Sequence, residues 1–258
     1  MYFIDTHTHL YLDEFKNDID KVIENAINNG VQKMFLPNIN SKTTSSMIEL
    51  CKQYPENCFA MIGLHPCEVE KESLYDELDH IESRLAKHNF IGIGEIGIDL
   101  HWDKTTLEIQ KEAFIKQIKI AKIHQLPIVI HVRNSFNETI EIVENLNDEN
   151  LKGVFHCFTG NIQEAERIIS LGNFYLGIGG VLTFKNSGLD KTIKIINLNN
   201  IMLETDSPYL SPTPLRGKRN ESKNIVNIAQ KLAEIKNISL EEVSEITTRN
   251  ATDLFKIS

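Results

Sequence analysis

Short apolar runs alternate with amphipathic stretches along the whole chain. The apolar runs have the length and residue types of strands buried on both faces. These runs are Phe3–Asp5, Gln32–Pro37, Cys58–Leu64, Ile91–Gly94, Pro127–Ile130, Gly153–Phe155, Asn173–Ile178 and Ile201–Glu204. The stretches after the first seven show helical periodicity and are Asp13–Asn29, Lys42–Tyr54, Ser73–His88, Thr106–His124, Ser135–Leu146, Gln163–Leu171 and Leu189–Ile196. After the eighth run, a proline-containing loop, Ser207–Asn220, precedes helical patterns at Lys223–Lys236 and Leu240–Phe255.

This alternation predicts an α/β fold, a closed TIM (β/α)8 barrel. The chain has 258 residues, close to the ~250 that are typical of one such barrel. No linker or low-complexity segment divides it, so we expect residues 1–258 to form a single domain. A doubly wound open sheet is the alternative, but its functional residues would concentrate at one switch point instead of following many strands.

Several of the predicted strands end near residues that bind metal ions. The candidate ligands are His7, His9, Glu95, His131, His156 and Asp206. Each one alone has an ordinary explanation, such as a surface histidine or a hydrogen-bonded core histidine. Strands of a parallel barrel all point the same way, so their C-terminal ends meet at one mouth, where catalytic groups collect. The set as a whole therefore predicts a metal centre, since imidazole and carboxylate are common ligands of divalent ions.

The surroundings of these ligands suggest finer roles. His7 and His9 are two residues apart, so both rings leave the same face of an extended chain. Glu95 has two oxygens and could bridge two ions, as in two-metal sites with ions ~3.5–4 Å apart. The glycines around it could also be plain sheet irregularities. We interpret Asp5 as a possible partner that holds an imidazole, and we expect Cys157 to face the core, away from His156.

Composition excludes some classes of protein. With 27 Lys+Arg against 36 Asp+Glu, the net charge of -9 argues against a broad basic face that coats duplex nucleic acid. The four cysteines show no CxxC pair, which favours reduced thiols over a disulfide framework. Neither a secretory signal nor an apolar run of ~18 residues is found, so we expect a cytoplasmic protein without a membrane span.

Several basic residues nevertheless fall near the predicted mouth. The candidate substrate-binding residues are His65, Arg133, Arg216, Lys218 and Arg219. Three of these cations occupy the loop after the eighth strand, a place where barrel enzymes often hold phosphate. A structural salt bridge for Arg133 and a merely solvated basic loop are the alternatives. Trp102 is interpreted as an aromatic residue that packs on a loop, with base stacking as a second possibility.

In combination, these motifs resemble those of the TatD family of metal-dependent deoxyribonucleases. The matching segments are Phe3-Ile-Asp-Thr-His-Thr-His-Leu10, Gly63-Leu-His-Pro66, Gly94-Glu-Ile-Gly-Ile-Asp99, Pro127-Ile-Val-Ile-His-Val-Arg133, Phe155-His-Cys-Phe-Thr-Gly160, Glu204-Thr-Asp-Ser-Pro-Tyr-Leu210 and Pro214-Leu-Arg-Gly-Lys-Arg-Asn220. The resemblance extends from Phe3 to Phe255 and implies a barrel of the amidohydrolase-like kind. The departures are Tyr11, where relatives usually carry an acidic or amide residue, Cys67, and Glu221-Ser222-Lys223. They affect substrate contacts rather than the predicted ligands.

The resemblance also implies a two-metal site for Mg²⁺, Mn²⁺ or Zn²⁺. The ligands of one ion would be His7, His9, Glu95 and Asp206, and those of the second Glu95, His131 and His156. The expected reaction is hydrolysis of DNA phosphodiesters from a 3′ end of single-stranded substrate, by attack of a metal-bound hydroxide. Asp206 and Glu95 are the predicted catalytic residues, with Asp206 accepting or orienting the proton. We expect the protein to act as a monomer on DNA.

Two other functions remain open at this point. The same barrel supports amidohydrolases, lactonases and aminoacyl-tRNA deacylases. Binuclear enzymes of that wider superfamily often bridge their ions with a modified lysine on strand four, where this chain has Glu95. A metal-holding or nucleic-acid-binding scaffold without catalysis is the other alternative. Degradation of single-stranded DNA, compared with small lactones and dipeptides, would distinguish these classes.

Overall fold

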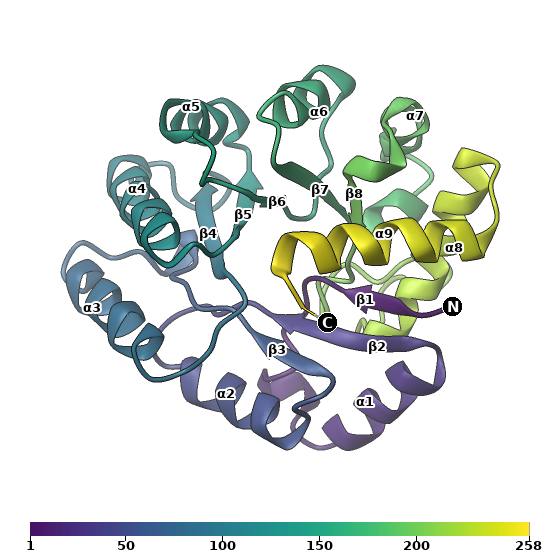
Figure 1. The fold of residues 1–258 in the computed structure, drawn as a ribbon, viewed down its shortest axis with the longest axis horizontal. Coiled ribbons are helices and arrows are strands. Elements are labelled where there is room, and N and C mark those ends of the chain that lie inside the picture. The colour runs from purple at the N-terminus through teal and green to yellow at the C-terminus, as the bar shows by residue number, and fades with distance from the viewer. Residues whose placement is uncertain (258) are drawn as a thin grey trace.

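Eight parallel strands form the centre of the structure, a computed structural model in which residues 1–257 are described (Figure 1). The strands are β1 (Phe3–Asp5), β2 (Val31–Leu36), β3 (Cys58–Ala60), β4 (Ile93–Asp99), β5 (Ile128–Arg133), β6 (Gly153–Phe155), β7 (Phe174–Ile178) and β8 (Ile201–Leu203). Each strand pairs with its neighbour in sequence, first from β1 to β3 and then from β4 to β8. This order is the one expected when successive strand–helix units add to one edge.

Hydrogen bonds join the two sets of strands at both edges. A parallel bridge between Ile62 and Ile93 continues β3 into β4. At the other edge, Thr8 forms a parallel bridge with Ser207, and the Thr6 amide donates to the Leu203 carbonyl at 3.1 Å. The ring of strands is therefore closed, and the predicted TIM barrel is confirmed.

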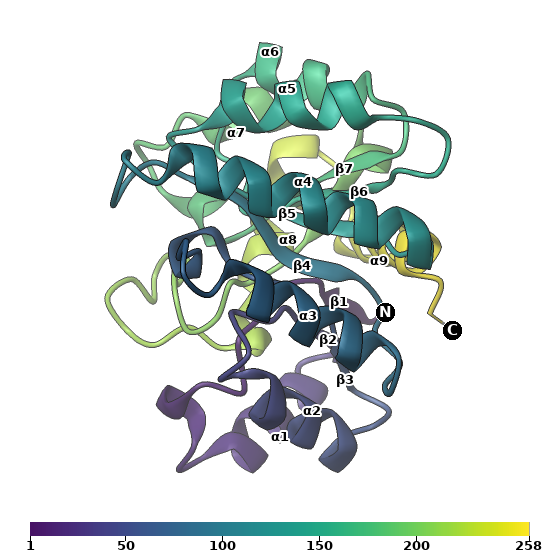
Figure 2. The ribbon, with the colours of Figure 1, turned by 90° about the vertical axis from the view of Figure 1, so that its left-hand side faces the viewer.

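An outer ring of helices surrounds the strands (Figure 1). These helices are α1 (Ile19–Asn28), α2 (Thr44–Gln53), α3 (Leu74–Leu85), α4 (Leu107–His124), α5 (Phe136–Leu146), α6 (Ile162–Ile169), α7 (Leu189–Ile195), α8 (Ile225–Lys236) and α9 (Leu240–Phe255). The two termini and α9 lie at one end of the barrel, and the loop after β8 projects at the other end (Figure 2). Within residues 1–257, no helix is both long enough and apolar enough to span a bilayer.

The alternation of strand side chains separates two apolar clusters. One cluster fills the barrel interior and takes one residue from each of several strands: Ile4, Phe35, Val129, Val154 and Met202. Helix α9 closes this end of the barrel, and its Phe255 ring lies 4.9 Å from the ring of Phe35. The neighbouring strand residues face outward and pack in a larger cluster with the surrounding helices. Apolar side chains thus fill the barrel interior at the α9 end, so a functional site inside the barrel has to lie at the opposite mouth.

Some predicted boundaries were wrong. Strands β4 and β5 continue to Asp99 and Arg133, so Glu95 and His131 lie within strands instead of ending them. The helix predicted from Asp13 begins only at Ile19, after a separate short turn at Asp13–Phe15. Phe15 in that turn is fully buried. Its packing holds the segment in place, although the segment is not continuous with the helix.

Candidate metal centre

The strand positions above the apolar interior carry the predicted ligands. Val129, Val154 and Met202 face inward. Since side chains of a strand repeat every second residue, the next inward positions are His131, His156 and Glu204. The same alternation that fills the barrel floor therefore places polar side chains one step closer to the mouth.

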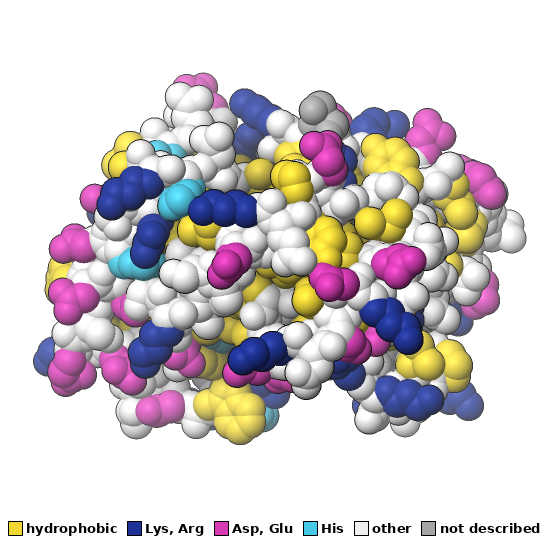
Figure 3. Space-filling model, turned by 90° about the horizontal axis from the view of Figure 1, so that it is seen from below, with side chains coloured by type: hydrophobic (Ala, Val, Ile, Leu, Met, Phe, Trp, Pro, Cys, Tyr) yellow, Lys and Arg dark blue, Asp and Glu magenta, His cyan; other side chains and the backbone are white. Residues whose placement is uncertain are grey.

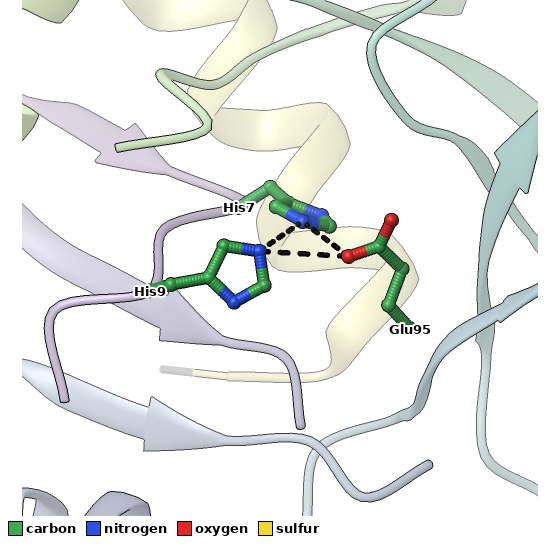
Figure 4. Close-up of side chains that lie close together, drawn as sticks. All are labelled: His7, His9 and Glu95. Atoms are coloured by element: carbon green, nitrogen blue, oxygen red, sulfur yellow. Dashed lines mark hydrogen bonds and ion pairs between the residues drawn. The ribbon is translucent and has the colours of Figure 1, made fainter. Parts of the chain in front are cut away.

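His7 and His9 reach the same place from the extension of β1. The backbone between them remains strand-like, since the Thr8 amide donates to the Phe35 carbonyl at 3.0 Å and the His9 amide donates to the Ser207 carbonyl at 2.7 Å. Both rings consequently point to one side, and their Nε2 atoms lie 3.3 Å apart. Figure 4 shows the two rings directed at the carboxylate of Glu95, which comes from the facing part of the barrel.

Glu95 lies between two groups of histidines, and each of its oxygens faces one group. Oxygen Oε2 is 3.1 Å from His7 Nε2 and 3.5 Å from His9 Nε2. Oxygen Oε1 is 2.6 Å from His131 Nδ1 and 2.8 Å from His156 Nε2. This division of one carboxylate is the arrangement that a bridging ligand requires.

The backbone around Glu95 is adapted to this position. The pairing of β4 with β5 shifts register between Ile93 and Ile96, an irregularity that includes Glu95. Beside it, a Cβ on Gly94 would lie 2.6 Å from Cβ of Val129. Only glycine therefore fits against the filled barrel interior at this point. The Gly-rich motif around Glu95 thus serves close backbone packing.

Asp206 completes the group around His7 and His9. Its Oδ1 lies 3.7 Å from His7 Nε2 and 3.6 Å from His9 Nε2. Its backbone has a φ of 56°, a left-handed conformation that is uncommon for residues other than glycine and that often marks functional sites. The Asp206 amide donates to the His7 carbonyl at 2.9 Å, which holds the two segments together.

Burial and close charges shift the pKa values of these groups in opposite directions. Burial raises the pKa of Asp206 to about 6, although His156 and His9 partly oppose this. Burial would also raise the pKa of Glu95, but His156, His65 and His7 hold it well below its ordinary value. For His156, burial would lower the pKa, and the Glu95 and Glu204 carboxylates instead raise it well above the usual value. In the metal-free protein, a proton on His156 or Asp206 therefore occupies the place that a metal ion would take.

The donor set fits divalent metal ions. Three overlapping groups have one ligand atom per residue within 4.8 Å of one another: His7, His9 and Glu95; His7, His156 and Asp206; and His65, Glu95 and His131. Within residues 1–257, the ion-pairing partners of Glu95, Asp206 and Glu204 are all histidines. Buried carboxylates without a permanent cation are costly, and a divalent ion removes that cost. The assignment of each residue as a ligand remains a prediction.

His65, predicted to bind the substrate, lies beside Glu95. Its Nε2 lies 3.3 Å from Glu95 Oε1, the oxygen that also faces His131 and His156. Its Nδ1 accepts a hydrogen bond from the Cys67 amide at 3.1 Å. The ring is therefore held with Nε2 toward the centre, where it can contact a metal ion as well as a phosphate oxygen.

Two carboxylates that lie beside the histidines were missed in the sequence. Asp99 Oδ2 lies 2.9 Å from His131 Nε2, so it fixes the ring with Nδ1 toward Glu95. Glu204 Oε1 lies 3.5 Å from His156 Nδ1 and accepts from the Cys157 amide at 2.6 Å. The even spacing of Asp99 from Glu95 and of Glu204 from Met202 was the available signal for both.

Tyr11 fixes the protonation pattern of His9. Its hydroxyl donates to the Pro37 carbonyl at 2.5 Å, so the phenol oxygen must accept the hydrogen bond from His9 Nδ1, 3.0 Å away. Burial raises the pKa of the phenol well above its ordinary value, which keeps it a donor. His9 therefore carries its proton on Nδ1 and leaves Nε2 free to bind a metal ion. Tyr11, one of the departures from the family motifs, thus orients a candidate ligand.

We expect Tyr11→Phe to weaken binding of the ion at His9 by about tenfold to a hundredfold, because the ring loses its orienting partner. Calorimetric titration of the metal-free protein with Mn²⁺ measures this change. Tyr209→Phe is the matched control, because that ring lies 6.3 Å from His9 and is half exposed. Equal Mn²⁺ affinities for wild type and Tyr11→Phe would show that the hydroxyl does not position His9.

Three interpretations of neighbouring residues were wrong. Asp5 does not hold an imidazole, since its carboxylate accepts from the amide and hydroxyl of Thr205 at 2.8 and 2.6 Å. Cys157 is half-buried and borders a cavity beside His156, because its φ of 47° turns the chain out of the strand. Trp102 does not pack on a loop: its side chain is 73% exposed and faces the Arg133 guanidinium at 5.3 Å.

The predicted phosphate-binding cations differ in whether they already pair with carboxylates of the protein. Arg219 forms a bidentate pair with Asp18 and a further bond to Glu221 at 3.0 Å, so its guanidinium is already committed to carboxylates. Arg216 is exposed and lies 3.7 Å above the Phe184 ring, and Lys218 is also exposed. Within residues 1–257, neither Arg216, Lys218 nor Arg133 forms an ion pair, so the salt bridge considered for Arg133 does not occur. These three cations therefore remain available to an anionic ligand.

Comparisons with known proteins show which family the chain is similar to. The model of the family described as TatD-related DNase matches residues 4–256. YabD of Bacillus subtilis, described as an uncharacterised metal-dependent hydrolase, is 37% identical over 98% of this chain and 99% of its own length. The crystal structure of YJJV, a TatD homologue from Escherichia coli, superposes with a TM-score of 0.93 at 28% identity, covering 99% of this chain and 98% of that one. A TatD-family hydrolase from Entamoeba histolytica superposes with a TM-score of 0.84 at 25% identity over 98% of both chains.

A closed barrel, a cluster of histidines and carboxylates at its mouth, and a family match over nearly the whole length thus lead to one assignment. The chain belongs to the TatD family of metal-dependent hydrolases.

Proposed function

We propose that this hydrolase cleaves phosphodiester bonds of DNA, as a 3′–5′ exonuclease on single strands. It would use two divalent ions, Mg²⁺, Mn²⁺ or Zn²⁺. The observation that carries the proposal is the position of Glu95, whose two oxygens each face a separate group of histidines. One carboxylate shared in this way supports a pair of cations, and paired cations suit displacement at a phosphate. The family description as DNase supports DNA as the substrate.

The residues of the chain have distinct roles in this proposal. His7, His9 and Asp206 would hold one ion and His131 and His156 the other, with Glu95 between them. Bound ions supply positive charge at the phosphate and lower the pKa of water. Asp206 would take or orient the proton of the attacking water, since its Oδ1 faces His7 and His9 and its second oxygen is left for the water.

The exposed cations at the mouth would contact the phosphates of the strand. Arg216 and Lys218 lie in the loop after β8, at the barrel end opposite the termini (Figure 2). On the face of Figure 3, basic and acidic side chains are interspersed and form no broad basic surface. Together with the net charge of -9, this favours a few local phosphate contacts at the mouth over binding along an extended duplex.

Purified protein supplied with Mn²⁺ should shorten a single-stranded oligonucleotide labelled at its 5′ end, one nucleotide at a time. EDTA should stop the reaction, and a 3′ phosphorothioate linkage should slow it. Small lactones and dipeptides, assayed in parallel, test the other hydrolase classes of this barrel. Hydrolysis of a lactone or dipeptide without any DNA cleavage would reject the proposal.

We expect the double variant Arg216→Ala/Lys218→Ala to raise KM for single-stranded DNA and to leave kcat nearly unchanged, because these residues bind the substrate and do not touch the reacting atoms. Two lost phosphate contacts should make the slope of log(kcat/KM) against log[salt] shallower by about 1.4. Lys231→Ala on α8, which pairs with Glu234, is the control. An unchanged salt slope in the double variant would exclude these phosphate contacts.

A further inference from the structure

A cavity of about 350 Å³ lies beside the metal centre, between the ends of β5 and β6 and their following helices. Its walls come from the segment between Val132 and Phe136, from the segment between Phe155 and Gly160, and from Glu164 on α6. Helices α5 and α6 are neighbours in the outer ring of Figure 1, so the cavity sits at the junction of two adjacent strand–helix units. Its volume falls in the range of small-molecule sites, about 300–1,000 Å³.

One candidate ligand borders the cavity. His156 forms part of its wall, and the Nε2 atom of the same ring lies 2.8 Å from Glu95 Oε1. A group held in the cavity would therefore be adjacent to a phosphate placed at the metal centre. A nucleotide whose phosphate lay at the metal centre would have its base or sugar within reach of this cavity.

The chemistry of the walls favours a neutral aromatic ring. The lining includes Phe136, which is partly exposed, and Phe155 and Phe158, which are buried behind it; Asn134 and Thr159 are exposed. Aromatic walls with a few neutral polar groups suit the flat face and the polar edge of a nucleobase. By contrast, the lining residues include neither lysine nor arginine, which a second phosphate would require.

The single acid in the wall is already engaged in local structure. Glu164 Oε2 accepts a hydrogen bond from the Asn161 amide at 2.8 Å, as part of the capping box of α6. It therefore needs no cation from a ligand, and the cavity does not select positively charged molecules.

The backbone on both sides of the cavity supports a functional role. Asn134 has a φ of 56° and Cys157 a φ of 47°, and both line the cavity. Asparagine adopts this left-handed conformation at small cost, but cysteine does so rarely. Such conformations persist only where the surroundings enforce them, and they cluster at ligand sites.

From these observations we propose that the cavity is a nucleobase-binding pocket, which receives the base of the nucleotide adjoining the scissile phosphate. The inference rests on the proposed nuclease function and deepens it. Binding by stacking is tolerant of base identity, because every base has a flat face. The pocket would therefore position nucleotides of any sequence, and it would discriminate strongly against a nucleotide that has no base.

The first test compares two oligonucleotides, one intact and one with a tetrahydrofuran abasic residue next to the scissile phosphate. We expect wild-type protein with Mn²⁺ to lose about 5- to 100-fold in kcat/KM on the abasic substrate, the range that one stacked base provides. Hydrolysis of bis(p-nitrophenyl) phosphate measures the metal chemistry alone. Equal rates on the intact and abasic oligonucleotides would overturn the proposal.

The second test fills the pocket from within the protein. Thr159→Trp should reduce kcat/KM on the intact oligonucleotide by about tenfold or more, but cause little further loss on the abasic one, since no base competes for the space. Thr252→Trp, in the cavity between α9 and the N-terminus, is the matched control. If Thr159→Trp reduced the rates on both oligonucleotides equally, the pocket would not bind the base.

Failure of the nuclease proposal would look different. In that case neither oligonucleotide would be cleaved, even though bis(p-nitrophenyl) phosphate was hydrolysed. The pocket would then be tested by titrating Mn²⁺-loaded protein with dAMP and with deoxyribose 5-phosphate. Tighter binding of dAMP, lost in Thr159→Trp, would support a base pocket without nuclease activity, and equal affinities would reject it.

Discussion

Replacing Glu95 with glutamine is expected to reduce metal-dependent hydrolysis on the order of a thousandfold. Glutamine keeps the size of the side chain and one oxygen, but it has no negative charge and its nitrogen cannot bind a metal ion. One of the two histidine groups, at Oε2 or at Oε1, would therefore lose its shared ligand. Because the two oxygens of Glu95 face both histidine groups, we expect this substitution to reduce activity more than the replacement of any one histidine.

Metal content and turnover should be measured on the same Glu95→Gln sample. We expect elemental analysis to show fewer bound ions per chain and circular dichroism to show an intact fold. Glu144→Gln is the matched control, since that carboxylate pairs with Arg167 on the outer helices. A Glu95→Gln protein that keeps the full metal content and wild-type turnover would refute the bridging role.

Adding Mn²⁺ to the metal-free protein is expected to raise its unfolding temperature, and to raise it more at pH 8 than at pH 6. An ion present at a hundredfold excess over its Kd stabilises the folded state by about 2.7 kcal/mol. For a chain of this size, that corresponds to a rise of roughly 5–10 °C. The Glu95→Gln protein should show a much smaller rise.

The direction of this pH effect follows from the pKa shifts in the metal-free state. Burial raises the pKa of Asp206 to about 6 and that of Asp5 to about 7, so folding becomes less favourable as pH rises from 4 to 7 and both lose protons. Despite burial, hydrogen bonds to Asp99 and Glu95 raise the pKa of His131, and Glu95 raises that of His156. The stability from these two histidines is fully present below pH 6.5 and is lost as the pH rises through the raised pKa of each ring.

At higher pH the metal-free protein therefore has more unprotonated ligands. Fewer protons have to leave when an ion binds, so the ion binds more tightly and stabilises the folded state more. The pKa values of Glu95, His7 and His65 are lowered instead, so these groups lose most of their protons at lower pH and change least between pH 6 and pH 8. Scanning calorimetry at pH 6, 7 and 8, with EDTA or with Mn²⁺, measures the difference. A shift that was constant over this range would show that the cluster does not exchange protons for metal.

Much of the fold was determined by the pattern of residues along the chain. Buried parallel strands are near-continuous apolar runs, and helices show a different period, so the order of the eight units is visible without a structure. The positions of His7, His9, His131 and His156 could be predicted because barrel topology sends all strand ends to one mouth. Local signals of this kind depend only on neighbouring residues.

The tertiary structure decided what these residues contact. The two oxygens of Glu95 divide between histidines from β5, β6 and the extension of β1, and this depends on a register shift that no sequence pattern reveals. Asp99 and Tyr11 orient histidines across distances that only folding closes. Likewise, Arg219 pairs with Asp18, far away in sequence, whereas Arg216 lies over the Phe184 ring and forms no ion pair within residues 1–257.

The sequence by itself therefore determined the barrel and the candidate ligands, because hydrophobic periodicity is a local property. Only the tertiary structure determined how the ligands are shared, which of them are held by partners, and which cations remain open to a substrate. Those features depend on distances of a few ångströms between residues far apart in the chain, and such distances exist only after the strands have closed into a ring.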